Sequence, residues 1–202
     1  MLKLNVGFSL VEMLISLLLG GVLLAMAVNL YLTSVATGTK NLKYSRLRAD
    51  IQSIMYMMET DIRRAGYGGS AFMVGSGANK TVDTINTGGQ HCIIYYYNHD
   101  DSNSITSADR MGIRLKPSSH EIQFGTGVDP RAVNCYDSGH WKALSDNKFI
   151  KITGLRFTES VVSNANATFR SVKIEINSEL TYENTAKYSQ STKVQVRNPE
   201  RR

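Results

Sequence analysis

One long uncharged stretch near the N-terminus constrains this chain more than any other feature. Of residues 4–39, only Glu12 carries a formal charge. The run from Phe8 to Leu32 is about 25 residues, which is long enough to cross a bilayer as a helix. A carboxylate inside lipid costs a few kcal/mol unless a cation accompanies it, so an acid at this depth predicts a function. Because Glu12 has no cationic neighbour in its own helix, its partner has to come from another molecule.

Helical periodicity continues beyond the apolar run. One apolar stripe, typical of an amphipathic helix, is formed by Leu47, Ile51, Ile54, Met55, Met58 and Ile62. Charged side chains, Asp61 among them, occupy the opposite face, which we expect to be mostly solvated. The first proline is Pro117. The pattern therefore predicts one helix from about Ser9 to about Ala65, apolar nearly all round in its first half and packed against a head in its second.

The rest of the chain predicts an antiparallel β-rich head. Residues 68–90 are rich in glycine, serine, threonine and asparagine, and predict a long loop. Period-two patterns predict strands, with a bulge at Gly154, at residues 92–97, 113–115, 121–124, 150–152, 155–157, 172–176 and 193–198. We expect Tyr95, Tyr96 and Tyr97 to alternate between core and surface. The fold class predicted is α+β, with a long N-terminal helix packed on an antiparallel sheet.

Cys92 and Cys135 are the only cysteines in the chain. An extracytoplasmic head would favour a disulfide between them, worth about 4 kcal/mol in the chain-entropy model. A metal site that also used His91 and His140 is a weaker alternative, because adjacent residues on a strand point to opposite faces. Free thiols remain a third possibility.

The sequence contains no pattern typical of an enzyme. There is no P-loop, HExxH, GxSxG or paired CxxC motif. We therefore predict no catalytic residues, no metal and no cofactor. Asp100–Asn103 predicts a solvated turn rather than a calcium loop, because it lacks the glycine and the bidentate glutamate of the EF-hand. The net charge of +6 is mildly basic and does not by itself indicate nucleic-acid binding.

The stretch Gly7-Phe8-Ser9-Leu10-Val11-Glu12-Met13-Leu14-Ile15 resembles the class III signal of type IV pilins and pseudopilins. The resemblance implies that a prepilin peptidase cuts between Gly7 and Phe8 and N-methylates Phe8. It also implies that Glu12 attracts the terminal amine of a neighbouring subunit, and that the fold is the family's lollipop. The expected parts are a leader at 1–7, a transmembrane half-helix at 8–32, an amphipathic half-helix at 33–65 and a head at 66–202.

Two further segments narrow the resemblance. Asp61–Gly69 is similar to a marker of PilW-like minor pilins, and Val194–Asn198 is similar to the last strand of PilW-like and J-type pseudopilins. The implied function is to help initiate pilus assembly near the fibre tip. The implied partners are other minor and major pilins, the prepilin peptidase and the inner-membrane assembly platform. The head would face the periplasm and later the cell surface. The residues do not indicate which of twitching, adhesion and DNA uptake the pilus serves.

Alternatives remain open at this stage. Ala25-Met26-Ala27 could end a secretory signal peptide, although Glu12 would interrupt its apolar core. A plain membrane anchor, a J-type pseudopilin of a type II secretion system, and a tip module that binds calcium, surfaces or DNA are the others. Four basic residues follow the apolar run and one, Lys3, precedes it; the four are Lys40, Lys43, Arg46 and Arg48. Since the more basic flank of a membrane helix usually faces the cytoplasm, this count by itself favours a topology with the head in the cytoplasm. The cleavage motif overrides that rule, because it requires a cytoplasmic leader.

Overall fold

The computed structural model describes residues 9–75, 80–86, 91–102, 104–136 and 138–201. They form one long helix, α1 (Leu10–Arg64), followed by antiparallel strands, so the predicted α+β class is confirmed. The predicted helix bounds differ from the observed ones by one residue at each end. The chain divides into two compact units, Met1–Ser45 and Arg46–Arg202, called here the N-terminal and the C-terminal unit, and α1 contributes to both.

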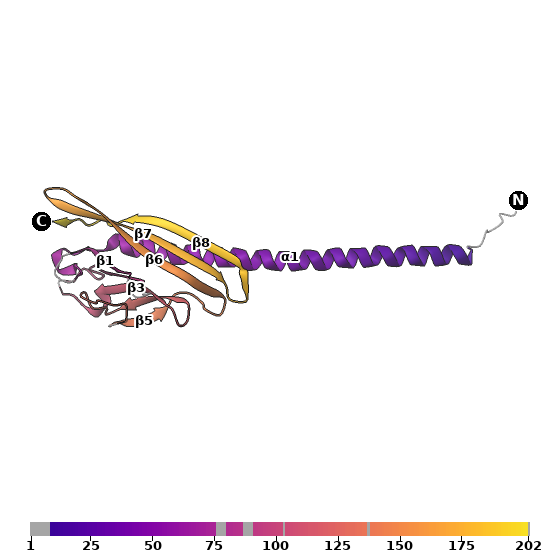
Figure 1. Ribbon diagram of the computed structural model, residues 1–202, viewed down its shortest axis with the longest axis horizontal. Coiled ribbons are helices and arrows are strands. Elements are labelled where there is room, and N and C mark those ends of the chain that lie inside the picture. The colour runs from indigo at the N-terminus through magenta and orange to yellow at the C-terminus, as the bar shows by residue number, and fades with distance from the viewer. Residues whose placement is uncertain (1–8, 76–79, 87–90, 103, 137, 202) are drawn as a thin grey trace. The chain divides into compact units, whose positions relative to one another are not determined.

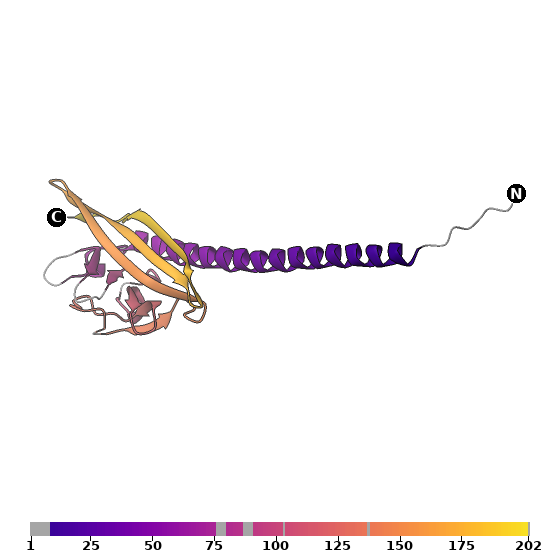
Figure 2. The ribbon, with the colours of Figure 1, turned by 45° about the vertical axis from the view of Figure 1, so that its right-hand side comes forward.

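The C-terminal unit contains two sheets in its described residues (Figures 1 and 2). The first has the order β1-β2-β3-β4-β5, with each strand antiparallel to the next along the chain: β1 (Val82–Ile85), β2 (Cys92–Tyr96), β3 (Arg110–Lys116), β4 (Glu121–Thr126) and β5 (His140–Ala143). The second has the order β6-β7-β8, with β9 also pairing with β7: β6 (Ile150–Ser163), β7 (Ala167–Leu180), β8 (Glu183–Gln195) and β9 (Glu200–Arg201). Short 3-10 helices lie at Ser70–Phe72 and Ser107–Asp109.

A single hydrophobic core joins the last part of α1 to both sheets. All six residues of the predicted apolar stripe are buried in it. They share the core with the inward-facing side chains of β2, β6 and β7, such as Ile93, Phe157 and Ile174. The stripe therefore packs as the periodicity predicts, because residues three and four apart lie on the same face of a helix.

The first sheet is covered on both faces, which corrects the prediction for the tyrosines. Tyr95, Tyr96 and Tyr97 are 0%, 2% and 7% exposed, so none of them is a surface residue. The face of β2 that points away from α1 belongs to a second core, formed with Phe72, Val74, Val128 and Cys135. Strand alternation predicts two opposite faces but not whether a loop covers the second one.

The prediction of a long loop at 68–90 is also wrong, because β1 and a 3-10 helix lie within it. The bulge at Gly154 is confirmed as a shift of register between Ile152 and Gly154. It occurs inside one long strand, β6, where two short strands were predicted. β8 begins ten residues earlier than predicted and ends at Gln195, because its exposed start, rich in polar residues, lacks the apolar alternation on which the prediction depended.

The buried tyrosines predict a loss of stability at alkaline pH. Burial and then the charge of Asp61 raise the pKa of Tyr95 well above 10, and burial raises that of Tyr96 and Tyr97. A raised pKa in the folded state contributes stability that is present below about pH 10 and is lost as the pH rises further. We expect the free energy of unfolding, measured by Trp141 fluorescence of the detergent-solubilised chain, to fall above pH 10. Tyr95→Phe should make this fall shallower, whereas Tyr182→Phe, at an 87% exposed residue, should not; equal slopes in both variants would contradict the explanation.

Candidate assembly site

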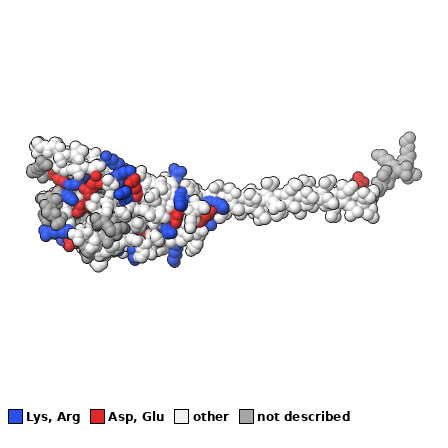
Figure 3. Space-filling model, viewed as in Figure 1, with Lys and Arg blue, Asp and Glu red and all other residues white. Residues whose placement is uncertain are grey.

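The N-terminal unit presents an apolar surface to its surroundings. Every described residue of this unit, from Ser9 to Ser45, is exposed. Fifteen leucine, isoleucine, valine and methionine side chains between Leu10 and Leu32 are among the exposed large hydrophobic residues. By length and composition this part of α1 could cross a membrane, and Figure 3 shows it almost free of charged side chains. An apolar surface of this extent requires lipid or protein to cover it.

Glu12 lies in the first turn of α1 and is exposed. Its backbone N–H donates to the carbonyl oxygen of Ser9 at 3.0 Å. The N-terminal end of a helix dipole favours negative charge by about 0.3–1 kcal/mol, which offsets only part of the cost of a carboxylate in lipid. A cation from another molecule would offset the part of this cost that remains. The predicted cleavage residues, Gly7 and Phe8, lie outside the described residues.

The end of α1 is bonded to the C-terminal segment of the chain. The side-chain N–H groups of Asn198 donate to the carbonyl oxygens of Arg64 at 3.1 Å and Ala65 at 2.9 Å. The backbone N–H of Arg197 donates to the carbonyl oxygen of Arg63 at 3.1 Å. Gly66 follows with a φ of 74°, and its N–H donates to the carbonyl oxygen of Tyr96 at 2.7 Å. The carbonyl groups that a helix end leaves without partners are thus satisfied by residues far away in sequence.

Asp61 fixes the same end of α1 to β2. It accepts hydrogen bonds from the hydroxyl groups of Tyr95 at 3.0 Å and Tyr97 at 3.3 Å. The guanidinium group of Arg64 lies 5.9 Å from the centre of the Tyr97 ring. Asp61 is therefore half-buried and bonded, contrary to the expectation that its face of the helix is mostly solvated.

A cluster of three charged side chains holds the last strand in place. The guanidinium group of Arg170 on β7 contacts Glu159 at 2.8 Å and Glu200 at 2.5 Å, and each side chain is less than one-fifth exposed. Burial disfavours the charge of Arg170, but the hydrogen bonds and charges of the two glutamates outweigh it and raise the pKa of Arg170. Glu200 also accepts from the backbone N–H of Thr81 at 2.7 Å, so β9 is linked to the segment before β1.

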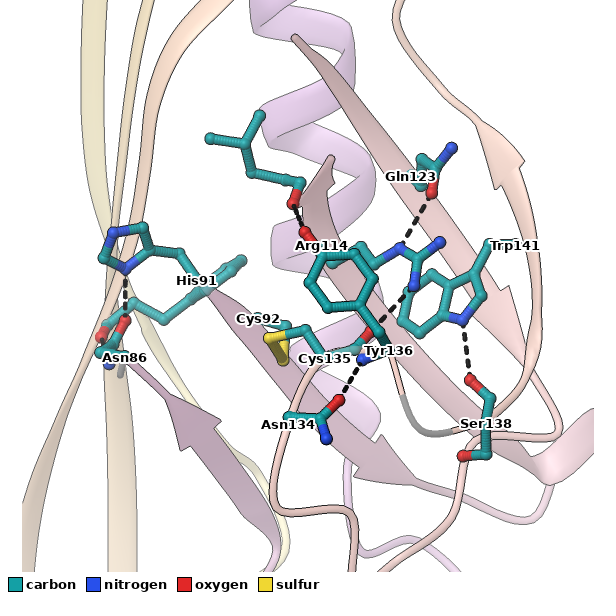
Figure 4. The surroundings of a disulfide bond; sticks show 12 residues. Asn86, His91, Cys92, Arg114, Gln123, Asn134, Cys135, Tyr136, Ser138 and Trp141 are labelled. Carbon is teal, nitrogen blue, oxygen red and sulfur yellow. Dashed lines mark hydrogen bonds between the residues drawn. A yellow bond between two sulfur atoms is a disulfide. The ribbon is translucent and has the colours of Figure 1, made fainter. Parts of the chain in front are cut away.

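Cys92 and Cys135 are joined by a disulfide at the edge of the second core (Figure 4). Arg114 lies beside it, between the rings of Tyr136 and Trp141, at 4.7 and 4.1 Å from their centres. Its guanidinium group donates to the side chain of Gln123 and to the carbonyl oxygen of Cys135, both at 2.9 Å. Burial lowers the pKa of Arg114. The loop that carries Cys135 is thus held by the disulfide and by a stacked arginine.

The four residues of the alternative metal site do not form one in the structure. Among the described residues, no group of three His, Cys, Asp or Glu side chains could hold a metal ion. His91 instead lies 3.1 Å from the side-chain oxygen of Asn86, and His140 is exposed at the start of β5.

Sequence reasoning missed Arg114, Arg170 and the helix-capping role of Asn198. Each is a polar residue whose partners are distant in sequence, so local periodicity carried no signal for it. The Val-x-Val-Arg-Asn pattern at residues 194–198 includes Asn198, but it predicts a strand and not a helix cap.

These features define a class of protein: an α+β chain whose long helix begins with an exposed apolar part that carries one acid, Glu12, and whose C-terminal unit is β-rich and contains a disulfide. A family model described as prepilin peptidase-dependent protein B matches residues 40–196. The chain belongs to this family and is a type IV pilin-related protein. No curated protein and no solved structure matches it. The matched residues exclude the N-terminal signal, so the family match is independent of the motif around Gly7.

We expect Asn198→Ala to lower the free energy of unfolding by about 1–2 kcal/mol, because it removes two hydrogen bonds to helix-end carbonyls. Asn198→Asp should cost at least as much, because a carboxylate cannot donate to them. Denaturant unfolding of the full chain in detergent checks both. Asn184→Ala, at an exposed asparagine of β8, should stay within about 0.5 kcal/mol of wild type; an Asn198→Asp variant as stable as wild type would contradict the cap.

We expect the protein isolated from an oxidising compartment to contain no free thiol. Thiol titration after unfolding should find two thiols with reductant and none without it. The Cys92→Ser, Cys135→Ser double variant should be less stable by up to about 4 kcal/mol. Two titratable thiols in the unreduced protein would show that the bond does not form in the cell.

Proposed function

We propose that this chain is a minor pilin of the PilW type, which helps to initiate assembly of a type IV pilus and lies at or near the fibre tip. The observation that carries the proposal is the exposed Glu12 in the otherwise uncharged half of α1. A subunit that is stored in lipid and then transferred to a fibre needs an apolar helix whose surroundings can change from lipid to protein. Glu12 has no ion-pair partner among the described residues, and an acid on such a helix favours neighbours that bring a cation to its level.

The cation in this proposal is the terminal amine of another subunit. Cleavage by the prepilin peptidase between Gly7 and Phe8 would create an amine on Phe8, which is then N-methylated and keeps its charge. Glu12 of one subunit would attract the amine of the next in the bilayer, where a charge pair is screened little. Other minor pilins, major pilins and the inner-membrane assembly platform are the proposed partners. The C-terminal unit would lie in the periplasm before it reaches the pilus.

The two segments that carry the resemblance contact each other, which supports a protein of the PilW-like or J-type group. Asp61–Gly69 ends α1, and Val194–Asn198 bonds to that end through Arg197 and Asn198. The contacts give Asn198 of the second marker a structural role, because its loss would leave the carbonyl groups of Arg64 and Ala65 in the first marker without this donor. A J-type pseudopilin of a type II secretion system shares the anchor and the last strand, and is the alternative. The Arg-Arg-Ala-Gly-Tyr sequence within the first marker favours the pilus.

The experiment that separates the two machines is a deletion strain, complemented with the wild-type gene and assayed for surface pili and for secreted enzymes. Loss of pili with intact secretion is expected. Lost secretion with normal pili would reassign the chain to the secretion system, and no change in either would refute both roles.

The same strain tests Glu12. We expect Glu12→Ala and Glu12→Gln to be processed normally, since both keep Gly7 and Phe8, but to leave pilus numbers at the level of the deletion, because neither side chain can pair with an amine. Asn29→Ala, a polar change elsewhere in the apolar stretch, is the matched control and should restore pili. Normal pilus numbers with Glu12→Gln would show that its charge has no part in assembly.

A further inference from the structure

The face of the β6-β7-β8 sheet that points away from α1 is rich in positive charge. Residues directly opposite each other in neighbouring antiparallel strands present their side chains on the same face. The register places on this face five cations and two carboxylates, in the cross-strand sets Lys151-Glu179-Lys187, Arg156-Glu175 and Lys173-Lys193. We call these five cations, Lys151, Arg156, Lys173, Lys187 and Lys193, the basic face.

The carboxylates do not neutralise this face. Glu175 pairs with Lys173 at 2.6 Å, and Glu179, which is 8% exposed, pairs with Lys151 at 3.2 Å. Three cations, Arg156, Lys187 and Lys193, are exposed and make no ion pair with any residue in the described part of the chain. Lys193 also lies directly opposite Lys173, an arrangement of like charges that destabilises a sheet. Packing does not require it, and a bound anion would relieve it.

The surroundings of the basic face add hydrogen-bond donors and a groove. A groove of about 850 Å³, walled by His91 and the β3–β4 turn, adjoins the basic face at Arg156, the one of its five cations that lines the groove. The exposed amide of Asn177 and hydroxyl groups of Ser189 and Ser191 line the groove. Towards the β6–β7 hairpin, the half-buried Phe169 lies between two hollows of about 580 and 530 Å³, and Lys193 lines both.

We propose that the basic face binds nucleic acid, with its cations and hydroxyl groups on the phosphate backbone and with Phe169 available to stack on a base. Phosphate contacts in protein–nucleic acid complexes come from Lys, Arg, Ser and Asn side chains of this kind. Aromatic rings beside cations are typical of surfaces that bind single strands. A lipid surface fits less well, since the face presents only Val162 and Phe169 for insertion. An acidic protein would use the cations but not the ring.

The test uses the full chain in nanodiscs of neutral lipid and a fluorescent single-stranded oligonucleotide of about 20 nucleotides. Anisotropy titrations across a series of salt concentrations give the affinity and its salt slope. The triple variant Arg156→Gln, Lys187→Gln, Lys193→Gln is expected to bind about tenfold or more weakly and to lower the salt slope by about two, at roughly 0.7 per lost phosphate contact. The matched control is Arg131→Gln, Lys142→Gln, Lys148→Gln, three exposed cations elsewhere, which should bind within about twofold of wild type.

Equal losses in the two triple variants would overturn the site, because net charge alone would then explain binding; so would no binding by wild type. Phe169→Leu is expected to weaken binding several-fold with an unchanged salt slope. A competition experiment compares polyglutamate of matched charge with unlabelled DNA. If polyglutamate displaces the oligonucleotide equally effectively, the result would favour an acidic protein partner and refute the proposal. The proposal does not depend on the assembly role: the basic-face variant is expected to make normal pili, and Glu12→Gln to bind the oligonucleotide normally.

Discussion

The need to cover apolar surface on one continuous helix governs this structure. Within α1 the pattern changes from apolar all round to a single apolar stripe, and the covering material changes with it. From Leu47 onward the stripe is buried by two sheets of the same chain. Before that point every described side chain is exposed, so the covering has to be lipid or protein from outside this chain. The proposed role, in which the apolar half of α1 moves from the membrane into a fibre, requires this division.

The end of α1 shows how a small β-rich unit is attached to such a helix. Asp61 accepts from Tyr95 of β2 and from Tyr97, the residue after that strand. The last carbonyl groups of α1 accept from Asn198 and Arg197, and Arg170 holds β9 through Glu200. The residues that form these contacts come from both ends of the C-terminal unit. Near the end of the chain, Arg197 and Asn198 bind the C-terminal end of α1. The two sheets are therefore anchored where the first and last segments of the C-terminal unit meet.

The two sheets differ in what covers their outer faces. The first sheet is closed by the disulfide loop, with Arg114 stacked between Tyr136 and Trp141 (Figure 4). The second sheet is open, and cations cover its outer face. An open sheet face tolerates lysines because water solvates them. The opposition of Lys173 and Lys193, however, destabilises the sheet, and no packing contact compensates for it. This difference between the faces is the reason for assigning binding to the second sheet and stability to the first.

The sequence by itself determined the helix, its change from apolar to amphipathic, and the position of the one acid in its apolar part, because these depend on local periodicity and on the cost of charge in lipid. It also determined most strand cores and the bulge at Gly154, because alternation is local. Only the tertiary structure decided that Tyr96 is buried, that Asn198 caps α1 and that Arg114 stacks beside the disulfide. It also decided which lysines share a face, since that follows from the register of β7 and β8. Each of these features depends on contacts between segments that are distant in sequence. A pattern within one segment cannot predict such contacts.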